Sequence, residues 1–274
     1  MAATLADIRI DKLWLNHYLK NYQEFLGPLR NEPVKLLELG IAKGDSLRHW
    51  SDWFPCATIA GLDIKPFQIE SGYDRVHCYQ GEQQDTRILD KIGNELAPEG
   101  FDIIIDDASH VGQLSRISFW HLFEHHLKPG GLYFIEDWGT GYWKDYPDGK
   151  HYTPPGVQFA WHERILNSLA KNNWIQNKRL LRKLVGYTRW NYVKSRFPSH
   201  NRGMVGFVKE LVDECGIADA TSPEFGCGQP RASRFEWVRF SHGHVIVKKP
   251  LLSETPTEPG REIYSGKFQL DQRF

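Results

Sequence analysis

Short apolar runs, each closed by polar or acidic residues, recur along the first half of the chain. They cover Val34–Leu39, Thr58–Leu62, Arg75–Tyr79, Ile103–Ile105 and Leu132–Ile135. Such runs are typical of strands that are buried on both faces of a parallel sheet. The intervening segments are long enough for the crossover helices that parallel strands require. The pattern therefore predicts a doubly wound, Rossmann-like α/β sheet.

Helical spacing of apolar residues predicts the elements that cover this sheet. An amphipathic helix starts at Asp11 and is ended by Gly27-Pro28. We interpret its His17 and Tyr18 as packing residues rather than as cofactor contacts. Further helices are expected over residues 46–54, 86–96, 110–127 and 203–216.

The C-terminal part of the chain returns to a strand pattern. Arg234–Phe240 and His244–Lys248 are strand-like, and Ser241-His242-Gly243 between them is short enough for a hairpin turn. These two strands bring the predicted sheet to seven strands. Residues 251–274 form a polar tail that we expect to pack poorly.

Residues 157–197 interrupt the sheet pattern and predict one or two amphipathic helices. From Arg164 to Arg202 there are ten Lys or Arg residues and no Asp or Glu, which is the strongest local charge bias of the chain. The segment suits a solvated helical face or an oligomer contact, and it also suits a lid that attracts phosphorylated or acidic acceptors such as a nucleotide-linked sugar. Within it, IQNKRLLRKLV sets apolar against basic positions, as expected of a helix that rests on an anionic membrane.

Composition adds few constraints. The 274 residues include 34 Lys or Arg and 34 Asp or Glu, so the net charge gives no general attraction to nucleic acid, and no nucleic-acid-binding module accompanies the basic segment. The four cysteines are scattered without metal-binding spacing, and the sequence has neither a secretory signal nor an apolar run of membrane-spanning length. We expect a cytoplasmic protein with reduced thiols.

Two of the predicted strands end in pairs of acidic residues. Asp106 and Asp107 follow one strand, Glu136 and Asp137 follow the next, and His110 lies three residues after Asp107. Ligands of open α/β sheets bind at the carboxyl ends of the strands. We therefore expect these side chains to meet on one rim of the sheet, where the chemistry takes place.

A turn with the pattern Glu38-x-Gly40-x-Ala42-x-Gly44 joins the first strand to a helix that begins near Ser46. It matches the dinucleotide-binding pattern G-x-G-x-x-G poorly, and an acid before the first glycine would repel a pyrophosphate. S-adenosylmethionine (SAM) fits better, because Glu38 suits its ammonium group while the turn backbone and the helix start suit its carboxylate.

The ends of the next strands supply further cofactor contacts. Asp63, 23 residues after Gly40, is placed to accept hydrogen bonds from the ribose hydroxyls. Glu82 and Gln83 are placed to contact the adenine, and Asp106 is placed near the methionine moiety. The predicted SAM site therefore extends over four strand ends.

Five motifs, in this order, resemble those of the class I SAM-dependent methyltransferases: LLELGIAKGDSLRHW, GLDIKP, QGEQQD, IIIDDASH and PGGLYFIEDWGTGYW. Within that family the chain resembles the metal-dependent sugar O-methyltransferases of antibiotic biosynthesis, such as those that act on macrolide deoxysugars and on the rhamnose of tetracenomycin-type compounds. Relatives called cephalosporin hydroxylases share the metal motif. The resemblance covers residues 11–144 and returns weakly over GMVGFVKELVDE and HVIVKK.

The resemblance implies that Asp107, Glu136 and Asp137 bind Mg²⁺ and that His110 is the general base. Carboxylate oxygens are the ligands that Mg²⁺ prefers. A bound cation lowers the pKa of a sugar hydroxyl and orients its oxygen, and a neutral imidazole can then accept the proton.

Two alanines depart from the pattern of the family. Ala42 replaces the second glycine that many methyltransferases have in the turn, and Ala108 replaces the glycine of the DDGSH motif. We expect the methyl group of Ala42 to fit, whereas Ala108 alters the backbone beside the metal. Neither change is expected to disable the site.

The sequence thus predicts a seven-stranded class I methyltransferase that uses SAM and Mg²⁺ to methylate a hydroxyl of a sugar or of a glycosylated or lipid-linked natural product. The alternatives are a metal-dependent, hydroxylase-like enzyme on the same fold and a non-catalytic SAM-binding module at a membrane. We expect a small-molecule or glycan acceptor, no nucleic acid, a homo-oligomer, and a peripheral membrane contact through the basic helix.

The same patterns divide the chain into five parts. They are an N-terminal helical cover (1–30), a SAM- and metal-binding core (31–149), a basic helical insertion or lid (150–203), a C-terminal helix and hairpin that complete the sheet (204–250), and a tail (251–274).

Overall fold

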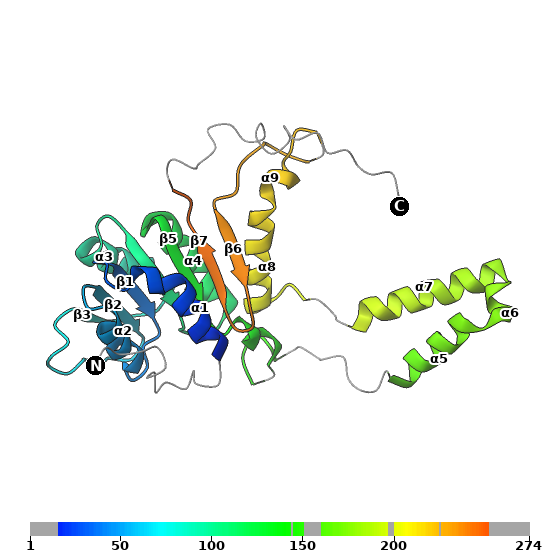
Figure 1. Cartoon of the computed structure of the whole chain (residues 1–274), viewed down its shortest axis with the longest axis horizontal. Helices are drawn as coiled ribbons and strands as arrows, with labels where there is room; N and C mark the ends of the chain where they lie inside the picture. Colours follow the sequence, from blue (N-terminus) through cyan, green and yellow to red (C-terminus); the bar gives the residue numbers. More distant parts are fainter. Residues whose placement is uncertain (1–15, 144, 151–159, 197–199, 225, 252–274) are drawn as a thin grey trace.

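A computed structural model describes residues 16–143, 145–150, 160–196, 200–224 and 226–251. At its centre lies a seven-stranded sheet with the strand order β3-β2-β1-β4-β5-β7-β6 (Figure 1). The strands are β1 (Lys35–Leu39), β2 (Thr58–Asp63), β3 (Val76–Gln80), β4 (Phe101–Asp106), β5 (Leu127–Ile135), β6 (Trp237–Phe240) and β7 (Val245–Lys248). The first five are parallel, whereas β7 runs antiparallel to both β5 and β6. The predicted seven-stranded α/β sheet with a C-terminal hairpin is confirmed.

Helices cover both faces of the sheet. One face packs against α1 (Asn16–Leu26) and α2 (Asp45–Trp53), and the other against α3 (Thr86–Leu96), α4 (Gly112–His125) and α8 (Gly203–Cys215). Each face has its own apolar core, because successive side chains of a strand point to opposite faces. In β1, Leu37 and Leu39 belong to the α3–α4–α8 core, whereas Leu36 belongs to the α1–α2 core.

Local chemistry explains where the first helices begin. The side chain of Asp85 accepts a hydrogen bond from the amide of Arg87 and so caps α3. Gly44 precedes α2 with a left-handed φ of 74°, and a Cβ at this position would lie 2.3 Å from the ring of Phe67. Both the backbone conformation and the space at residue 44 therefore require glycine.

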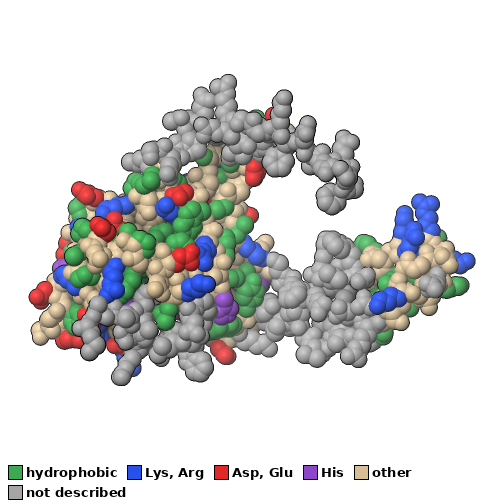
Figure 2. All heavy atoms as spheres, in the orientation of Figure 1, with side chains coloured by type: hydrophobic (Ala, Val, Ile, Leu, Met, Phe, Trp, Pro, Cys, Tyr) green, Lys and Arg blue, Asp and Glu red, His purple; other side chains and the backbone are tan. Residues whose placement is uncertain are grey.

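The basic segment forms three helices rather than the predicted one or two: α5 (Ala160–Lys171), α6 (Asn173–Gln176) and α7 (Arg179–Arg196). They pack on one another and project away from the sheet (Figure 1), with Lys and Arg side chains gathered on their surface (Figure 2). Asn172 separates α5 from α6, because its side chain accepts a hydrogen bond from the amide of Trp174 and starts a new helix. Apolar periodicity alone does not reveal such a break.

Short helices complete the described part of the chain: η3 (Gly27–Leu29) and η4 (Trp138–Tyr142), both 3₁₀ helices, and α9 (Ile217–Ala220). The start of the predicted first helix (11–15) and the predicted polar tail from residue 252 lie outside the described residues. Within the described ranges, no helix is long and apolar enough to cross a membrane.

Candidate active site

A cavity of about 300 Å³ opens at the carboxyl edge of the sheet. Its walls come from the ends of β1, β2, β3 and β4 and from the first turn of α4, namely from Gly40, Leu62, Asp63, Ile64, Gly81, Glu82, Gln83, Gln84, Ala108, Ser109 and Leu114. Ligands of open α/β sheets bind in this position. Four of the predicted cofactor-binding residues, Gly40, Asp63, Glu82 and Gln83, line the cavity.

Asp63 holds the glycine turn that forms one wall. Its Oδ2 accepts hydrogen bonds from the amides of Ile41 (3.0 Å) and Ala42 (2.9 Å). Gly40 lies against the loop after β4, since a Cβ at this glycine would be 2.3 Å from the carbonyl oxygen of Asp107. Its φ of 85° also favours glycine. The turn thus connects the cavity wall directly to the acidic rim.

The alternation of side chains along the strands separates the four rim carboxylates. Asp106 points to the face that α4 covers, whereas Glu136 points to the face that α1 covers. Asp107 and Asp137 follow them and lie at the edge of the sheet, where both are partly exposed. Adjacent acids in the sequence therefore have different surroundings.

Asp106 is enclosed behind the cavity. Its carboxylate accepts hydrogen bonds from Nε2 of Gln83 (3.2 Å) and from the amide of Ala108 (3.3 Å). Burial raises the pKa of Asp106, and hydrogen bonds from Ser115 and its other partners partly offset this rise. Oε1 of Gln83 in turn accepts a hydrogen bond from the amide of Ser109 (3.0 Å). Asp106 and Gln83 thereby join the loops after β3 and β4.

Asp107, His110 and Asp137 converge at the rim. Nε2 of His110 lies 3.9 Å from Oδ1 of Asp107 and 3.9 Å from Oδ2 of Asp137. One ligand atom from each of the three lies within 4.8 Å of the others. Glu136, the third residue implied as a metal ligand, is not in this group, because its carboxylate is buried against Tyr22. The two carboxylates of the group suit a hard divalent cation such as Mg²⁺.

Backbone strain is concentrated at the same place. Among the described residues, the non-glycine residues with positive φ are Ala42 (44°), His110 (53°) and Asp137 (53°). A left-handed backbone costs a residue with a Cβ about 1–2 kcal/mol, and folds retain it mostly where surrounding contacts enforce it, often at functional sites. Ala108 has no positive φ, so this backbone does not require the glycine that the family has there.

Two tyrosines of α1 hold the carboxylates that follow β5. Tyr18 is buried, as predicted, and its Oη donates a hydrogen bond to Oδ1 of Asp137 (2.6 Å) while accepting one from the amide of Asp137 (3.2 Å). Tyr22, one helical turn later, donates to Oε1 of Glu136. Burial raises the pKa of both tyrosines, and the neighbouring carboxylates raise it further. Both hydroxyls therefore stay protonated and act as donors.

His244, directly before β7, completes this buried group. Its ring stacks on Tyr18, with 4.1 Å between centroids and 7° between planes, and its Nε2 lies 3.7 Å from Oε1 of Glu136. Asn21 fixes the other ring nitrogen, with Nδ2 at 3.2 Å from Nδ1. Sequence reasoning did not assign Asn21, Tyr22 or His244 to the site, because they come from distant parts of the chain. One signal in the sequence pointed toward His244, because the segment HVIVKK that begins with it resembles the family.

The segment after η4 forms the outer wall of the rim. The ring centroid of Tyr146 lies 6.0 Å from that of His110, and Trp143 packs edge-to-face against Tyr146 (5.6 Å). Oδ2 of Asp148 accepts hydrogen bonds from backbone amides in the first turns of α4 (2.7 Å) and α8 (2.8 Å). Asp148 thus caps two helices at once and holds this wall next to His110.

Some predicted cofactor residues do not line the cavity. Glu38 is fully buried on the α1–α2 face, where its charge raises the pKa of Tyr22, and Ser46 is buried in α2. Ala42 is exposed on the turn, and Asp106 lies behind the cavity. The lining also includes residues that were not predicted to contact the cofactor, although all but the last lie within the quoted motifs, namely Leu62, Ile64, Gly81, Gln84, Ser109 and Leu114.

The residues present fit the two groups that the sequence implies. The cavity lies between the glycine turn and the ends of β2 and β3, where a nucleoside-containing cofactor has polar partners in Asp63 and Glu82. The oxygen-rich group of Asp107 and Asp137 borders it through the contact of Gly40 with the loop after β4. A methyl donor and a metal ion would therefore lie side by side.

Comparison with known proteins identifies O-methyltransferases that are similar in sequence. No protein-family model matches the chain. The mycinamicin VI 2''-O-methyltransferase of Micromonospora griseorubida is 41% identical over 136 residues, which are 46% of this chain and 32% of that enzyme. The 8-demethyl-8-(2-methoxy-alpha-L-rhamnosyl)-tetracenomycin-C 3'-O-methyltransferase of Streptomyces olivaceus is 38% identical over 144 residues, which are 50% of this chain and 36% of that enzyme.

A solved structure shares the fold over almost the whole chain. It is the MycE methyltransferase from the mycinamycin biosynthetic pathway in complex with Mg and SAH, with a TM-score of 0.61 and 26% identity over 96% of this chain and 58% of that chain. Another structure of MycE also contains mycinamycin VI. The present chain spans about a third of the length of the curated relatives it matches.

Proposed function

We propose that this chain, which has the class I SAM-dependent methyltransferase fold and is related to the sugar O-methyltransferases of macrolide and tetracenomycin biosynthesis, transfers a methyl group from SAM to a sugar hydroxyl. The convergence of Asp107, His110 and Asp137 beside the cavity carries the proposal. The acceptor is a glycosylated small molecule, and this part of the proposal is supported by the MycE structure with mycinamycin VI, Mg and SAH.

The reaction transfers one methyl group and releases one proton. The acceptor oxygen forms a bond to the methyl carbon of SAM, the bond from that carbon to sulfur breaks, and S-adenosylhomocysteine (SAH) leaves. The hydroxyl proton passes to Nε2 of His110, since imidazole accepts protons near neutral pH. Asp107 and Asp137 would hold Mg²⁺, whose charge lowers the pKa of the hydroxyl, whereas Glu136 is buried against Tyr22 and lies outside their group.

In this proposal the remaining site residues have two kinds of roles. Gly40, Asp63, Glu82 and Gln83 contact the cofactor directly, as their position in the cavity lining supports. The other predicted cofactor residues hold the glycine turn and the strand ends around the cofactor. Three of them are buried, namely Glu38, Ser46 and Asp106, and the amide of Ala42 donates a hydrogen bond to Asp63.

SAH release from SAM in the presence of a panel of glycosylated acceptors tests the proposal. EDTA should abolish release, and added Mg²⁺ should restore it. A full rate in EDTA would contradict the metal role. SAH formed in equal amount to a methylated product separates methyl transfer from hydroxylase-like chemistry. SAM binding without SAH release from any acceptor would instead favour a non-catalytic module.

We further propose that the α5–α7 hairpin makes a peripheral contact with an anionic membrane. Leu180, Leu184 and Tyr187 are exposed at helical spacing on α7, next to the exposed cations Arg182 and Lys183. Sedimentation with anionic liposomes should be lost in the double variant Leu180→Asp, Leu184→Asp. If the unchanged protein does not sediment with liposomes, the membrane contact does not exist. A change of the acceptor KM in the double variant would instead favour a lid over the active site.

A further inference from the structure

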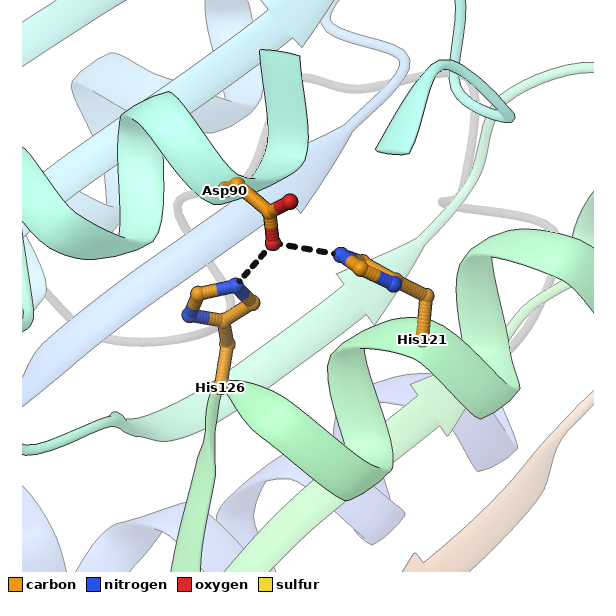
Figure 3. A group of neighbouring side chains, drawn as sticks. All are labelled: Asp90, His121 and His126. Atoms are coloured by element: carbon orange, nitrogen blue, oxygen red, sulfur yellow. Dashed lines mark hydrogen bonds and ion pairs between the residues drawn. The ribbon is translucent and has the colours of Figure 1, made fainter. Parts of the chain in front are cut away.

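We propose that Asp90, His121 and His126 form a second metal site, which binds a transition-metal ion of the zinc type and joins α3 to α4 (Figure 3). Nε2 of His121 and Nε2 of His126 lie 2.7 Å and 2.8 Å from the same oxygen, Oδ1 of Asp90. One ligand atom from each of the three lies within 4.8 Å of the others.

The donor atoms distinguish this group from the rim. Two imidazole nitrogens and one carboxylate oxygen suit Zn²⁺, whereas the two carboxylates at the rim suit Mg²⁺. In a tetrahedral zinc site with bonds of about 2.0–2.1 Å, neighbouring ligand atoms are about 3.3 Å apart. Oδ1 of Asp90 now lies 2.7 Å and 2.8 Å from the two Nε2 atoms, so it would move away from them by about 0.5 Å when the ion binds. The Asp90 side chain is 46% exposed, which leaves it free to move and gives a water molecule access as the fourth ligand.

The surface of α3 is shaped for the ring of His126. Gly93 lies nearly one turn after Asp90, and a Cβ at Gly93 would be 2.2 Å from Nδ1 of His126. Glycine is unfavourable inside a helix, and the space that it leaves is occupied by the imidazole. The backbone of His126 is also fixed, because its amide donates to Leu122 and its carbonyl accepts from Phe101. One nitrogen donor is therefore preorganised.

The carboxylate is prepared as a ligand as well. The hydrogen bond from His126 lowers the pKa of Asp90, and that from His121 lowers it further. Asp90 is therefore ionised at neutral pH, as a metal ligand must be.

The group lies at the opposite edge of the sheet from the candidate active site. His126 pairs with Phe101, the first residue of β4, whereas Asp107 follows the last residue of that strand. The two ends of the strand are roughly 17 Å apart at about 3.3 Å per residue. An ion at Asp90 would therefore stabilise the folded chain, through its preferential binding to the native state, without taking part in methyl transfer.

Zn²⁺ titration of the full chain by calorimetry, in excess Mg²⁺ and in the background of Asp107→Asn, tests the proposal. The Asp107→Asn change weakens the rim group, so that tight Zn²⁺ binding reports on the second group. We expect one Zn²⁺ per chain and a rise in Tm. Adding His121→Gln should weaken Zn²⁺ binding by about 100-fold and abolish the rise in Tm.

Two further variants keep the result decisive. Asp90→Asn changes a partly exposed helix position and should weaken Zn²⁺ binding without unfolding the chain, whereas His77→Gln, on β3, is the matched control and should leave the binding unchanged. Absence of Zn²⁺ binding, or equal affinity in His121→Gln, Asp90→Asn and His77→Gln, would overturn the proposal.

Discussion

The hydroxyl of Tyr18 donates a hydrogen bond to Oδ1 of Asp137 over 2.6 Å and joins two residues that are 119 positions apart in the chain. Tyr18 belongs to the helix that precedes the sheet, whereas Asp137 follows the fifth strand. Because Asp137 has a strained φ of 53°, this contact helps to hold its carboxylate in place. The N-terminal helix is thus part of the candidate metal site.

Replacing Tyr18 with phenylalanine should raise the Mg²⁺ concentration needed for half-maximal SAH release by about tenfold, since partners that orient metal ligands typically contribute this much to affinity. SAM affinity should change little, because Tyr18 does not line the cavity. Initial rates at a series of Mg²⁺ concentrations measure the effect. Tyr79→Phe, on β3, serves as the control, and an unchanged Mg²⁺ requirement in Tyr18→Phe would show that Asp137 does not depend on the tyrosine.

His110→Gln should lower the rate of methyl transfer by about 10²–10⁴-fold, the usual contribution of a general base. SAM affinity, measured by calorimetry, should be retained. His125→Ala, which removes an exposed histidine of α4, should keep the rate. A wild-type rate in His110→Gln would exclude His110 as the base.

Gly40→Ala should destabilise the chain more than Gly72→Ala does. Both glycines have positive φ, 85° and 101°, so both variants lose about 1–2 kcal/mol through the backbone. Only at Gly40 does the new Cβ collide with backbone, at 2.3 Å, whereas nothing lies within 4 Å at Gly72. The collision should add about 1–3 kcal/mol to the loss of stability in Gly40→Ala, which urea unfolding can measure. SAM binding should also be lost in this variant. Equal losses in the two variants would argue against the close contact.

Ala42→Gly should stabilise the chain by about 0.5–1 kcal/mol, because it relieves the left-handed backbone at φ 44° and this gain exceeds the greater flexibility of glycine in the unfolded chain. Urea unfolding measures the change. Ala220→Gly, in the short helix α9, should have the opposite sign. If Ala42→Gly is destabilising as well, position 42 is not strained.

Because of Glu214, the free energy of unfolding should depend on pH in the acid range. Its carboxylate accepts hydrogen bonds from Arg231 (2.7 Å) and Arg234 (3.1 Å). Burial alone would raise the pKa of Glu214, but these arginines lower it from 4.5 to about 2. Because the folded-state pKa is the lower one, the stabilisation is complete above pH 4.5 and is lost as the pH falls toward 2.

The variant Glu214→Gln tests this dependence. At pH 7 it should lower the free energy of unfolding by about 2 kcal/mol, and its difference from the unchanged protein should shrink between pH 4.5 and 2. Glu236→Gln is the matched control, because Glu236 pairs with Lys248 at the surface and such pairs contribute about 0–1 kcal/mol. A difference that is constant with pH would mean that Glu214 acts through packing alone.

Much of the fold was determined by local sequence patterns. The helix predicted over residues 86–96 has those bounds in the structure, and all seven strands lie where apolar runs were found. The reason is that burial on both faces selects apolar residues strand by strand. The break at Asn172 escaped prediction, since a side-chain cap there overrides the apolar period.

The sequence by itself also determined that Asp106, Asp107, Glu136 and Asp137 reach one edge of the sheet, because they end parallel strands. Only the tertiary structure decided how these acids divide. Asp106 and Glu136 turn to opposite faces and become buried, while Asp107 and Asp137 meet His110 at the rim.

The partners of these acids were likewise decided by packing. Tyr18, Tyr22 and His244 come from the two ends of the described chain, and no spacing in the sequence relates them to Glu136 and Asp137. They meet there because α1 covers one face of the sheet and His244, directly before the strand that pairs with β5, turns its ring to the same face. Local periodicity records which residues are buried, whereas only the packed elements determine which buried groups touch.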